Sequence, residues 1–371
     1  MIPDLISHLE EPDRPRTAFI GLDGFVDEII HVVDKRFSPL SYERIKRIKD
    51  YADRIERASA MSTNIELVSL KTKMGGNGPI LTNALLNFGV TTIYMGSIGT
   101  PPMDPIMEPL RRCKRLIGLA QPAHTDALEF EDGKIIASKL TSLDSISWES
   151  IRSNIPMGEL VVLFQESDLI AFSNWSMILG MNGIWEGFLK EIAPQLDCQK
   201  KVAFFDLADP EKRSHDDLRR ALALIKSFAH EGFRVLLSLN LKEAFEVSKV
   251  LELPVTESAT ADLAKLLGAL QEKLEIGCVI VHPIDRAACL DSEDHYEEVR
   301  GPYCEHPILT TGAGDNFNAG FLYGVLQSFH AAECLLLGCA TSGYYVRYAD
   351  SPTKEKVITF LSDWEQNRLD R

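Results

Sequence analysis

The segment Thr310 to Gly320 (TTGAGDNFNAG) places an acid directly after a glycine turn. Beyond it, apolar residues recur every four positions, at Phe317, Phe321, Val325 and Phe329. This spacing predicts a helix that begins close to Asp315. Backbone N–H groups of Gly312, Ala313 and Gly314, together with the positive potential of the helix end, suit an anion. Asp315 would repel a bound phosphate, but it could take the proton of a hydroxyl that attacks a phosphoryl group. The alternative is that Asp315 only caps the helix.

A second glycine cluster, Gly75-Gly76-Asn77-Gly78-Pro79, opens another helical pattern. Pro79 suits the first position of a helix. The glycines let a ligand approach the backbone, and the Asn77 side chain can donate to and accept from a hydroxyl. We therefore expect Gly75, Gly76 and Asn77 to meet a substrate, although the cluster also fits a plain strand-to-helix turn.

Two acids, Asp23 and Asp27, follow the apolar run Thr17 to Leu22. The carboxyl ends of strands in open α/β sheets face the ligand crevice, so either acid could accept hydrogen bonds from sugar hydroxyls. Asp23-Gly24 is equally a common turn sequence.

The strand pattern ending at Leu239 is followed by Asn240 and, three residues later, Glu243. One helical turn separates the two side chains, so they can face a common point and hold a hydrated Mg²⁺, which takes few protein ligands. The alternative is a capping box, in which the two residues satisfy the first N–H groups of a helix.

Short apolar runs alternate along the chain with longer amphipathic ones, which predicts one α/β domain over residues 1–371 with a doubly wound, mostly parallel sheet. The expected strands are Thr17 to Leu22, Thr91 to Met95, Asp168 to Phe172, Lys201 to Asp206, Phe233 to Leu239 and Gly277 to His282. Two segments interrupt the alternation and predict a small accessory layer: a charged helix over Ser41 to Ala60 and a hairpin over Ala127 to Leu140 that turns at Asp132-Gly133.

Composition narrows the class of protein. The 371 residues carry 39 Lys and Arg against 54 Asp and Glu, a net charge of −15, which argues against a nucleic-acid or membrane partner because both need a cationic surface. The seven scattered cysteines indicate reduced thiols and a cytoplasmic protein. A dinucleotide-binding oxidoreductase fits poorly, because Phe317 stands where G-x-G-x-x-G needs its third glycine.

Taken in this order, the four motifs resemble the PfkB family of carbohydrate kinases, which have the ribokinase-like fold. The likeness is strongest at 310–320 and 75–89. It implies a central sheet with a small β lid, here within 28–74 and 120–145, and a homodimer through that lid. It also implies ATP, Mg²⁺ and a small sugar or nucleoside-like acceptor that is phosphorylated on a hydroxymethyl group.

The resemblance assigns roles to these residues. Asp315 is the catalytic base, and Gly312, Ala313 and Gly314 form the anion hole. Asn240 and Glu243 organise Mg²⁺ and phosphate, and His282 ends a strand on the nucleotide side. Gly75, Gly76 and Asn77 meet the acceptor, with Asp23 and Asp27 as further acceptor ligands.

The chain departs from the family pattern at Ile80, where a sugar-binding Asn is usual, and at Leu309, where an acid is usual. These departures leave a second function open, a catalytically weak sugar or nucleoside sensor on the same fold. The identity of the acceptor is open as well: the acids at 23 and 27 suit a neutral polyol or a nucleoside, whereas Lys71, Lys73 and Lys139 suit a phosphorylated sugar.

Overall fold

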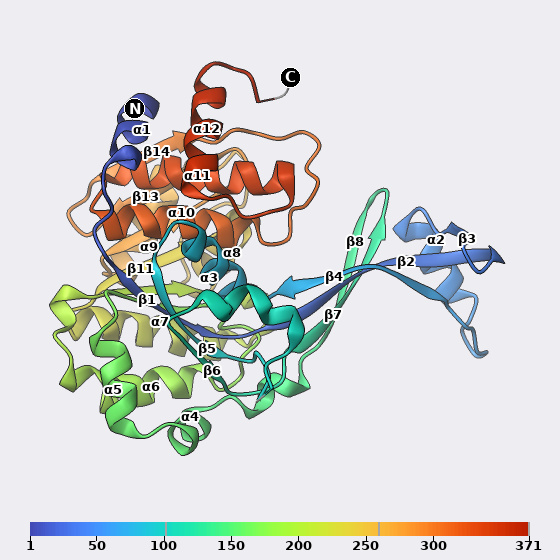
Figure 1. Ribbon diagram of the computed structural model, residues 1–371, viewed down its shortest axis with the longest axis horizontal. Helices are drawn as coiled ribbons and strands as arrows, with labels where there is room; N and C mark the ends of the chain where they lie inside the picture. The colour runs from blue at the N-terminus through green and yellow to red at the C-terminus, as the bar shows by residue number, and fades with distance from the viewer. Residues whose placement is uncertain (101, 259, 370–371) are drawn as a thin grey trace.

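The computed structural model describes residues 1–100, 102–258 and 260–369, and within them the largest element is a nine-stranded sheet (Figure 1). Its order is β14-β13-β12-β11-β10-β9-β1-β5-β6; the strands from β12 to β6 run parallel, and β13 and β14 pair antiparallel at one edge. The strands are β1 (Thr17–Leu22), β5 (Thr91–Gly96), β6 (Arg115–Gly118), β9 (Leu169–Phe172), β10 (Val202–Asp206), β11 (Arg234–Leu239), β12 (Cys278–Val281), β13 (Arg286–Asp291) and β14 (Tyr296–Arg300).

Helices cover both faces of this sheet. One face packs against α4 (Trp148–Asn154), α5 (Met157–Gln165), α6 (Met181–Glu191), α7 (His215–His230), α8 (Leu241–Val250) and α9 (Leu263–Leu274). The other packs against α1 (Ile2–Glu10), α3 (Asn77–Asn87), α10 (Ala313–Gln327), α11 (Ala331–Tyr348) and α12 (Lys354–Glu365). Short 3₁₀ turns occur at Pro105–Arg112, Thr141–Ser145, Ala193–Gln195, Cys198–Lys200 and Pro210–Lys212. None of the described helices is long and apolar enough to span a membrane.

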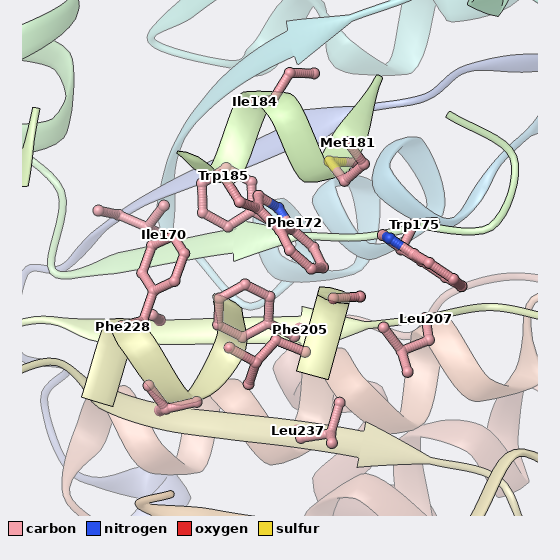
Figure 2. Close-up of a cluster of buried hydrophobic side chains, with 14 of the residues drawn as sticks. Ile170, Phe172, Trp175, Met181, Ile184, Trp185, Phe205, Leu207, Phe228 and Leu237 are labelled. Atoms are coloured by element: carbon pink, nitrogen blue, oxygen red, sulfur yellow. The ribbon is translucent and has the colours of Figure 1, made fainter. Parts of the chain in front are cut away.

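Aromatic packing holds the centre of the sheet against α6 and α7 (Figure 2). The ring of Phe205 lies 5.0 Å from Trp185, 5.0 Å from Phe228 and 5.7 Å from Phe172, measured between centroids. All four side chains are almost fully buried. Because close-packed rings resist displacement, the carboxyl ends of β9 and β10 are held in fixed positions.

A second, five-stranded sheet projects from the body of the described chain, and we call it the arm (Figure 1). Its strands are β2 (Phe25–Ser38), β3 (Ser41–Arg44), β4 (Leu67–Gly75), β7 (Ala123–Phe130) and β8 (Gly133–Lys139), with α2 (Ile48–Glu56) beside β3 at the tip. The arm exposes large apolar side chains at Phe37, Leu40, Leu67, Leu70 and Ile136. A homodimer through this sheet would cover part of that surface, and it stays a prediction.

The fold class is confirmed, and each of the six expected strands is present to within one residue at its ends. The helix predicted over Ser41 to Ala60 is wrong at both ends: Ser41–Arg44 is strand β3, and α2 ends at Glu56. The reason is tertiary, because β2 extends to Ser38 and offers an edge with which β3 pairs. The hairpin between 127 and 140 is present, but its turn is Glu131-Asp132, because Gly133 already pairs with Phe130.

Candidate active site

Two cavities meet at the N-terminus of α10. One, of about 200 Å³, lies between the arm and α3, and we call it the arm-side cavity. The other, of about 510 Å³, is lined by α11 and the loop after β14, and we call it the α11-side cavity. Residues of the same short loop line both: Thr311, Gly312 and Asp315 face the arm side, and Thr310, Ala313 and Gly314 face the α11 side. A group bound in one cavity can therefore reach a group bound in the other across this loop.

The loop has its shape because Gly312 is the residue before the helix. Its φ of +98° is in the left-handed region, and a Cβ there would lie 2.8 Å from the hydroxyl oxygen of Tyr345. That hydroxyl donates to the carbonyl of Thr311 at 2.8 Å, which fixes the start of the turn. Ala313 already donates its N–H to the carbonyl of Thr310 at 3.0 Å. Of the three predicted N–H donors, that of Ala313 is therefore engaged within the loop, while Gly312 and Gly314 stay predicted anion ligands, with the N–H of Asp315 next in the helix.

Asp315 is a buried carboxylate, 7% exposed, in the wall of the arm-side cavity. Burial raises its pKa well above the usual value, and the nearby carboxylates of Asp206 and Asp23 raise it further. A hydrogen bond with Asn77 and the charge of Lys73 act in the opposite direction. A carboxylate that is costly to ionise binds a proton more readily, which is the property a general base requires.

Asp23 lies beneath the start of α3 and is fully buried. Its carboxylate accepts hydrogen bonds from the N–H groups of Asn77 (2.9 Å) and Gly78 (2.8 Å) and from Nδ2 of Asn174 (2.7 Å). Burial raises its pKa to about 6, against the effect of these bonds. Asp23 is predicted to accept from sugar hydroxyls, but both of its oxygens accept from protein donors and Asp23 is not part of the cavity lining. These bonds hold the start of α3 in position.

Asn174, and not Asp23, lines the arm-side cavity at the carboxyl end of the sheet. It follows β9 and adopts φ +61°, which is rare for a residue other than glycine. Its Nδ2 is bound to Asp23, whereas its buried Oδ1 has no hydrogen-bond partner among the described residues. A buried acceptor without a donor is suited to a ligand hydroxyl. The sequence signal was available, because Asn174 lies two residues beyond a correctly predicted parallel strand.

Asp27 and Lys73 are the charged residues that the arm contributes to the cavity lining. They are opposite each other on β2 and β4, with Lys73 Nζ 3.6 Å from Asp27 Oδ2, and both are largely buried. Burial raises the pKa of Asp27 and lowers that of Lys73, and the opposite charge of each partner works against these shifts. Gly75 does not line the cavity, but a Cβ there would lie 2.3 Å from the Asp27 carboxylate. Gly75 therefore makes room for Asp27, whereas Gly76 and Asn77 face the cavity directly.

Asn240 and Glu243 form the capping box of α8. Glu243 Oε2 accepts from the N–H of Asn240 at 2.9 Å, and Asn240 Oδ1 accepts from the N–H of Glu243 at 3.0 Å. Burial raises the pKa of Glu243 well above its usual value, and the negative charges of Asp206, Asp209 and Asp315 raise it further. Carboxylates whose charges raise the pKa of Glu243 in this way favour a cation near it.

Asp206 was missed as a site residue, although the strand that ends with it was predicted. Its carboxylate accepts from Asn318 Nδ2 at 2.9 Å and from the N–H of Ala208 at 2.8 Å. Burial raises its pKa to about 6. A strand that ends in an acid at the carboxyl edge of a parallel sheet was the available signal.

His282 lines the α11-side cavity together with Asn240. Its ring stacks on Phe317 at a centroid distance of 4.6 Å, and burial lowers its pKa to about 4. The imidazole is therefore neutral near pH 7 and offers a flat ring with hydrogen-bonding nitrogens, without a charge for phosphate.

The fold and the site define a carbohydrate kinase of the ribokinase-like class. The fold is similar to that of Arabidopsis thaliana ribokinase solved with ribose and ATP, at 15% identity and a TM-score of 0.65, over 94% of this chain and 98% of that one. It is also similar to Thermotoga maritima ribokinase, at 16% identity and a TM-score of 0.62, over 94% and 100% of the two chains.

Residues 7–364 match the prokaryotic ketohexokinase family, and the chain belongs to that family. A curated relative, the ketohexokinase of Haloferax volcanii, is 27% identical over 357 residues, which are 96% of this chain and 93% of that protein. The departures at Ile80 and Leu309 therefore occur within a family of sugar kinases.

Because Asp23 and Asp315 have different surroundings, we expect replacement of each by asparagine to have opposite effects on the free energy of unfolding. In Asp23→Asn, three N–H donors converge on a side chain that has lost one acceptor, so we expect a loss of about 1–3 kcal/mol. In Asp315→Asn, a desolvated charge is removed, so the free energy of unfolding should exceed that of the wild type. Urea unfolding of both variants at pH 7 measures the difference.

The pH dependence gives the control. The native pKa of Asp315 lies above its unfolded value, so its ionisation costs stability progressively as pH rises from the unfolded towards the native pKa. The advantage of Asp315→Asn should therefore grow as the pH rises above the ordinary carboxyl range. An Asp315→Asn protein that is less stable than the wild type throughout would show that Asp315 is a helix cap.

Proposed function

We propose that the protein transfers the terminal phosphoryl group of ATP to a hydroxymethyl oxygen of an unphosphorylated ketohexose. The observation that carries this proposal is the loop from Thr310 to Asp315, whose residues alternate between two cavities. The larger cavity, about 510 Å³, suits the nucleotide, and the smaller, about 200 Å³, suits a single sugar ring. The ketohexokinase name of the matched family and of the Haloferax relative supports the sugar class, and the ATP bound to Arabidopsis ribokinase supports the donor.

The polar groups of the arm-side cavity suit a neutral polyol. Asp27 and Asn174 Oδ1 can accept from hydroxyls, and Lys73 can donate to a neighbouring oxygen. The charged side chains in this lining are Asp27, Lys73 and Asp315, a net charge of −1, which disfavours a sugar phosphate. Lys71 and Lys139 are absent from the lining, and Lys139 pairs instead with Asp126 at 2.8 Å.

In the proposed reaction, the oxygen of the sugar hydroxyl forms the new bond to phosphorus while the Asp315 carboxylate takes the proton of that hydroxyl. The bond from phosphorus to the ADP oxygen breaks, and ADP leaves with the electron pair. N–H groups of Gly314 and Asp315 are placed at the helix start to stabilise charge on the transferred group. The arm would act as a lid in this reaction, because its residues Asp27 and Lys73 line the acceptor cavity and would limit access of water to a bound sugar.

Asn240, Glu243 and Asp206 are the residues that would hold Mg²⁺. Their oxygens fit a hydrated hard cation, and the charges of neighbouring acids, Asp206 among them, contribute to the raised pKa of Glu243. Bound there, the ion would neutralise charge on the phosphoryl group during transfer.

Replacing the base should separate catalysis from binding. We expect Asp315→Asn to keep ATP binding and to lower turnover of a ketohexose by about two to four decades, because only the proton acceptor is lost. Coupled ADP release and nucleotide titration measure the two quantities. Turnover within a few-fold of the wild type would return Asp315 to a capping role, and a wild type that binds ketohexose without releasing ADP would favour the sensor alternative.

Gly75 offers a test of the acceptor side. Gly75→Ala should displace the Asp27 carboxylate and raise the KM for the sugar by about tenfold or more, since a charge-assisted hydrogen bond contributes about 1.5–3 kcal/mol. The KM for ATP should stay unchanged. Gly158→Ala is the matched control, because a Cβ there meets nothing within 4 Å. Equal sugar KM values in the two variants would exclude Asp27 from acceptor binding.

Glu243 has a capping role and a proposed metal role, which Glu243→Gln can distinguish. Glutamine can retain the capping box, so the free energy of unfolding should scarcely change. Loss of the carboxylate should raise the Mg²⁺ concentration needed for half-maximal rate. A variant that loses about 1 kcal/mol of stability with unchanged Mg²⁺ dependence would leave only the cap.

A further inference from the structure

The outer face of the arm carries a cluster of ligand-bearing side chains that the phosphoryl-transfer site does not use. Strand alternation assigns the faces: Asp27 and Thr125 line the arm-side cavity, so Glu28, His124 and Asp126 point away from it. Among the residues that the structure describes, these are the three His, Cys, Asp or Glu side chains whose ligand atoms gather within 4.8 Å of one another.

The distances within the cluster match a small tetrahedral ion. Nε2 of His124 is 3.2 Å from Glu28 Oε2 and 3.2 Å from Asp126 Oδ1. Tetrahedral bonds of about 2.0 Å give ligand-to-ligand separations of about 3.3 Å, so the three atoms need little movement to bind one ion. The strands fix this geometry, because Glu28 pairs directly with Asp126 and Val26 pairs with His124 in the parallel ladder.

Charge also favours a cation here. Glu28 and Asp126 are like charges directly opposite each other on neighbouring strands, an arrangement that is destabilising by itself. Lys139 offsets part of this charge. Its Nζ pairs with Asp126 Oδ2 at 2.8 Å, so Oδ1 is the oxygen that faces His124. The three side chains are 19–35% exposed, so an ion can enter from solvent and complete its coordination with water.

We propose that Glu28, His124 and Asp126 form a binding site for a zinc-type divalent transition metal on the outer face of the arm. One imidazole nitrogen with two carboxylate oxygens selects such an ion over Mg²⁺, which prefers oxygen ligands alone. This site is separate from the proposed magnesium residues Asn240 and Glu243, which follow β11 in the nine-stranded sheet.

The position of the site gives it a structural consequence. Glu28 follows Asp27 in β2, and His124 and Asp126 flank Thr125 in β7, which pairs with Asp27 across the two strands. An ion that joins the outer face of these strands would fix the spacing of the residues that face the sugar.

The test is direct zinc binding. Wild type is equilibrated with Zn²⁺ in excess Mg²⁺, passed through a desalting column and analysed for metal and protein. We expect one zinc per chain, with affinity lowered by more than about tenfold in His124→Ala and Glu28→Gln. His31→Ala is the matched control, because it removes a histidine from the same sheet, where His31 contacts Tyr42 and Arg44, and it should retain the zinc.

Cobalt supplies a second measurement on the same protein. Co²⁺ bound in tetrahedral geometry should give visible absorption bands that are absent from His124→Ala. Asp126→Asn replaces either variant if that variant fails to fold, as judged by circular dichroism. Wild type that retains no more zinc than His124→Ala, or equal retention by all variants, would overturn the proposal.

Discussion

The desolvation of one carboxylate at the start of α10 is the constraint on which the site depends. Asp315 is buried beside Asp23 and Asp206, and each of these three acids has a raised pKa. Such a group persists only if its surroundings cannot relax away from it. Gly312, Tyr345 and the aromatic packing beneath β9 and β10 supply that rigidity, and they hold the loop between the two cavities.

The arm also affects the desolvated carboxylate of Asp315, from the opposite side of the arm-side cavity. Its strands bring Asp27 and Lys73 over the cavity that Asp315 lines, and the charge of Lys73 opposes the rise in the pKa of Asp315. The arm therefore contributes both acceptor groups and part of the electrostatic balance of the base. The arm projects from the body in Figure 1, and the proposed metal cluster of half-buried side chains lies on its outer face.

Local sequence patterns were sufficient to predict the strands of the central sheet, because strands such as β1 and β11 are buried runs of apolar residues with clear boundaries. They were insufficient for the arm. β2 and β4 carry many charged residues, and their pairing joins segments distant in sequence, so neither strand was predicted. The Ser41–Arg44 segment was assigned to a helix for the same reason, since its strand exists only through β2.

Motif spacing located the glycine loop and Asp315, but not the partners that define each acid's role. Asp23 and Asp27 look equivalent in the sequence; they differ in the structure because Asp23 is hydrogen-bonded to the start of α3 and Asp27 lines the cavity. Asn174 and Asp206 lie at the ends of strands that were predicted correctly, so inspecting the residues after every parallel strand would have found both. The capping box at Asn240 was foreseen as an alternative, whereas its proximity to other carboxylates depends on the assembled sheet.

The most direct measurement is a crystal structure of the enzyme with a ketohexose and a non-hydrolysable ATP analogue. We expect the sugar in the arm-side cavity, with a hydroxymethyl oxygen within about 3 Å of an Asp315 carboxylate oxygen and other hydroxyls hydrogen-bonded to Asp27 and Asn174. The analogue should occupy the α11-side cavity, with its terminal phosphate at the loop from Thr310 to Asp315. A sugar bound in the α11-side cavity, or one whose hydroxymethyl groups both point away from Asp315, would contradict the account.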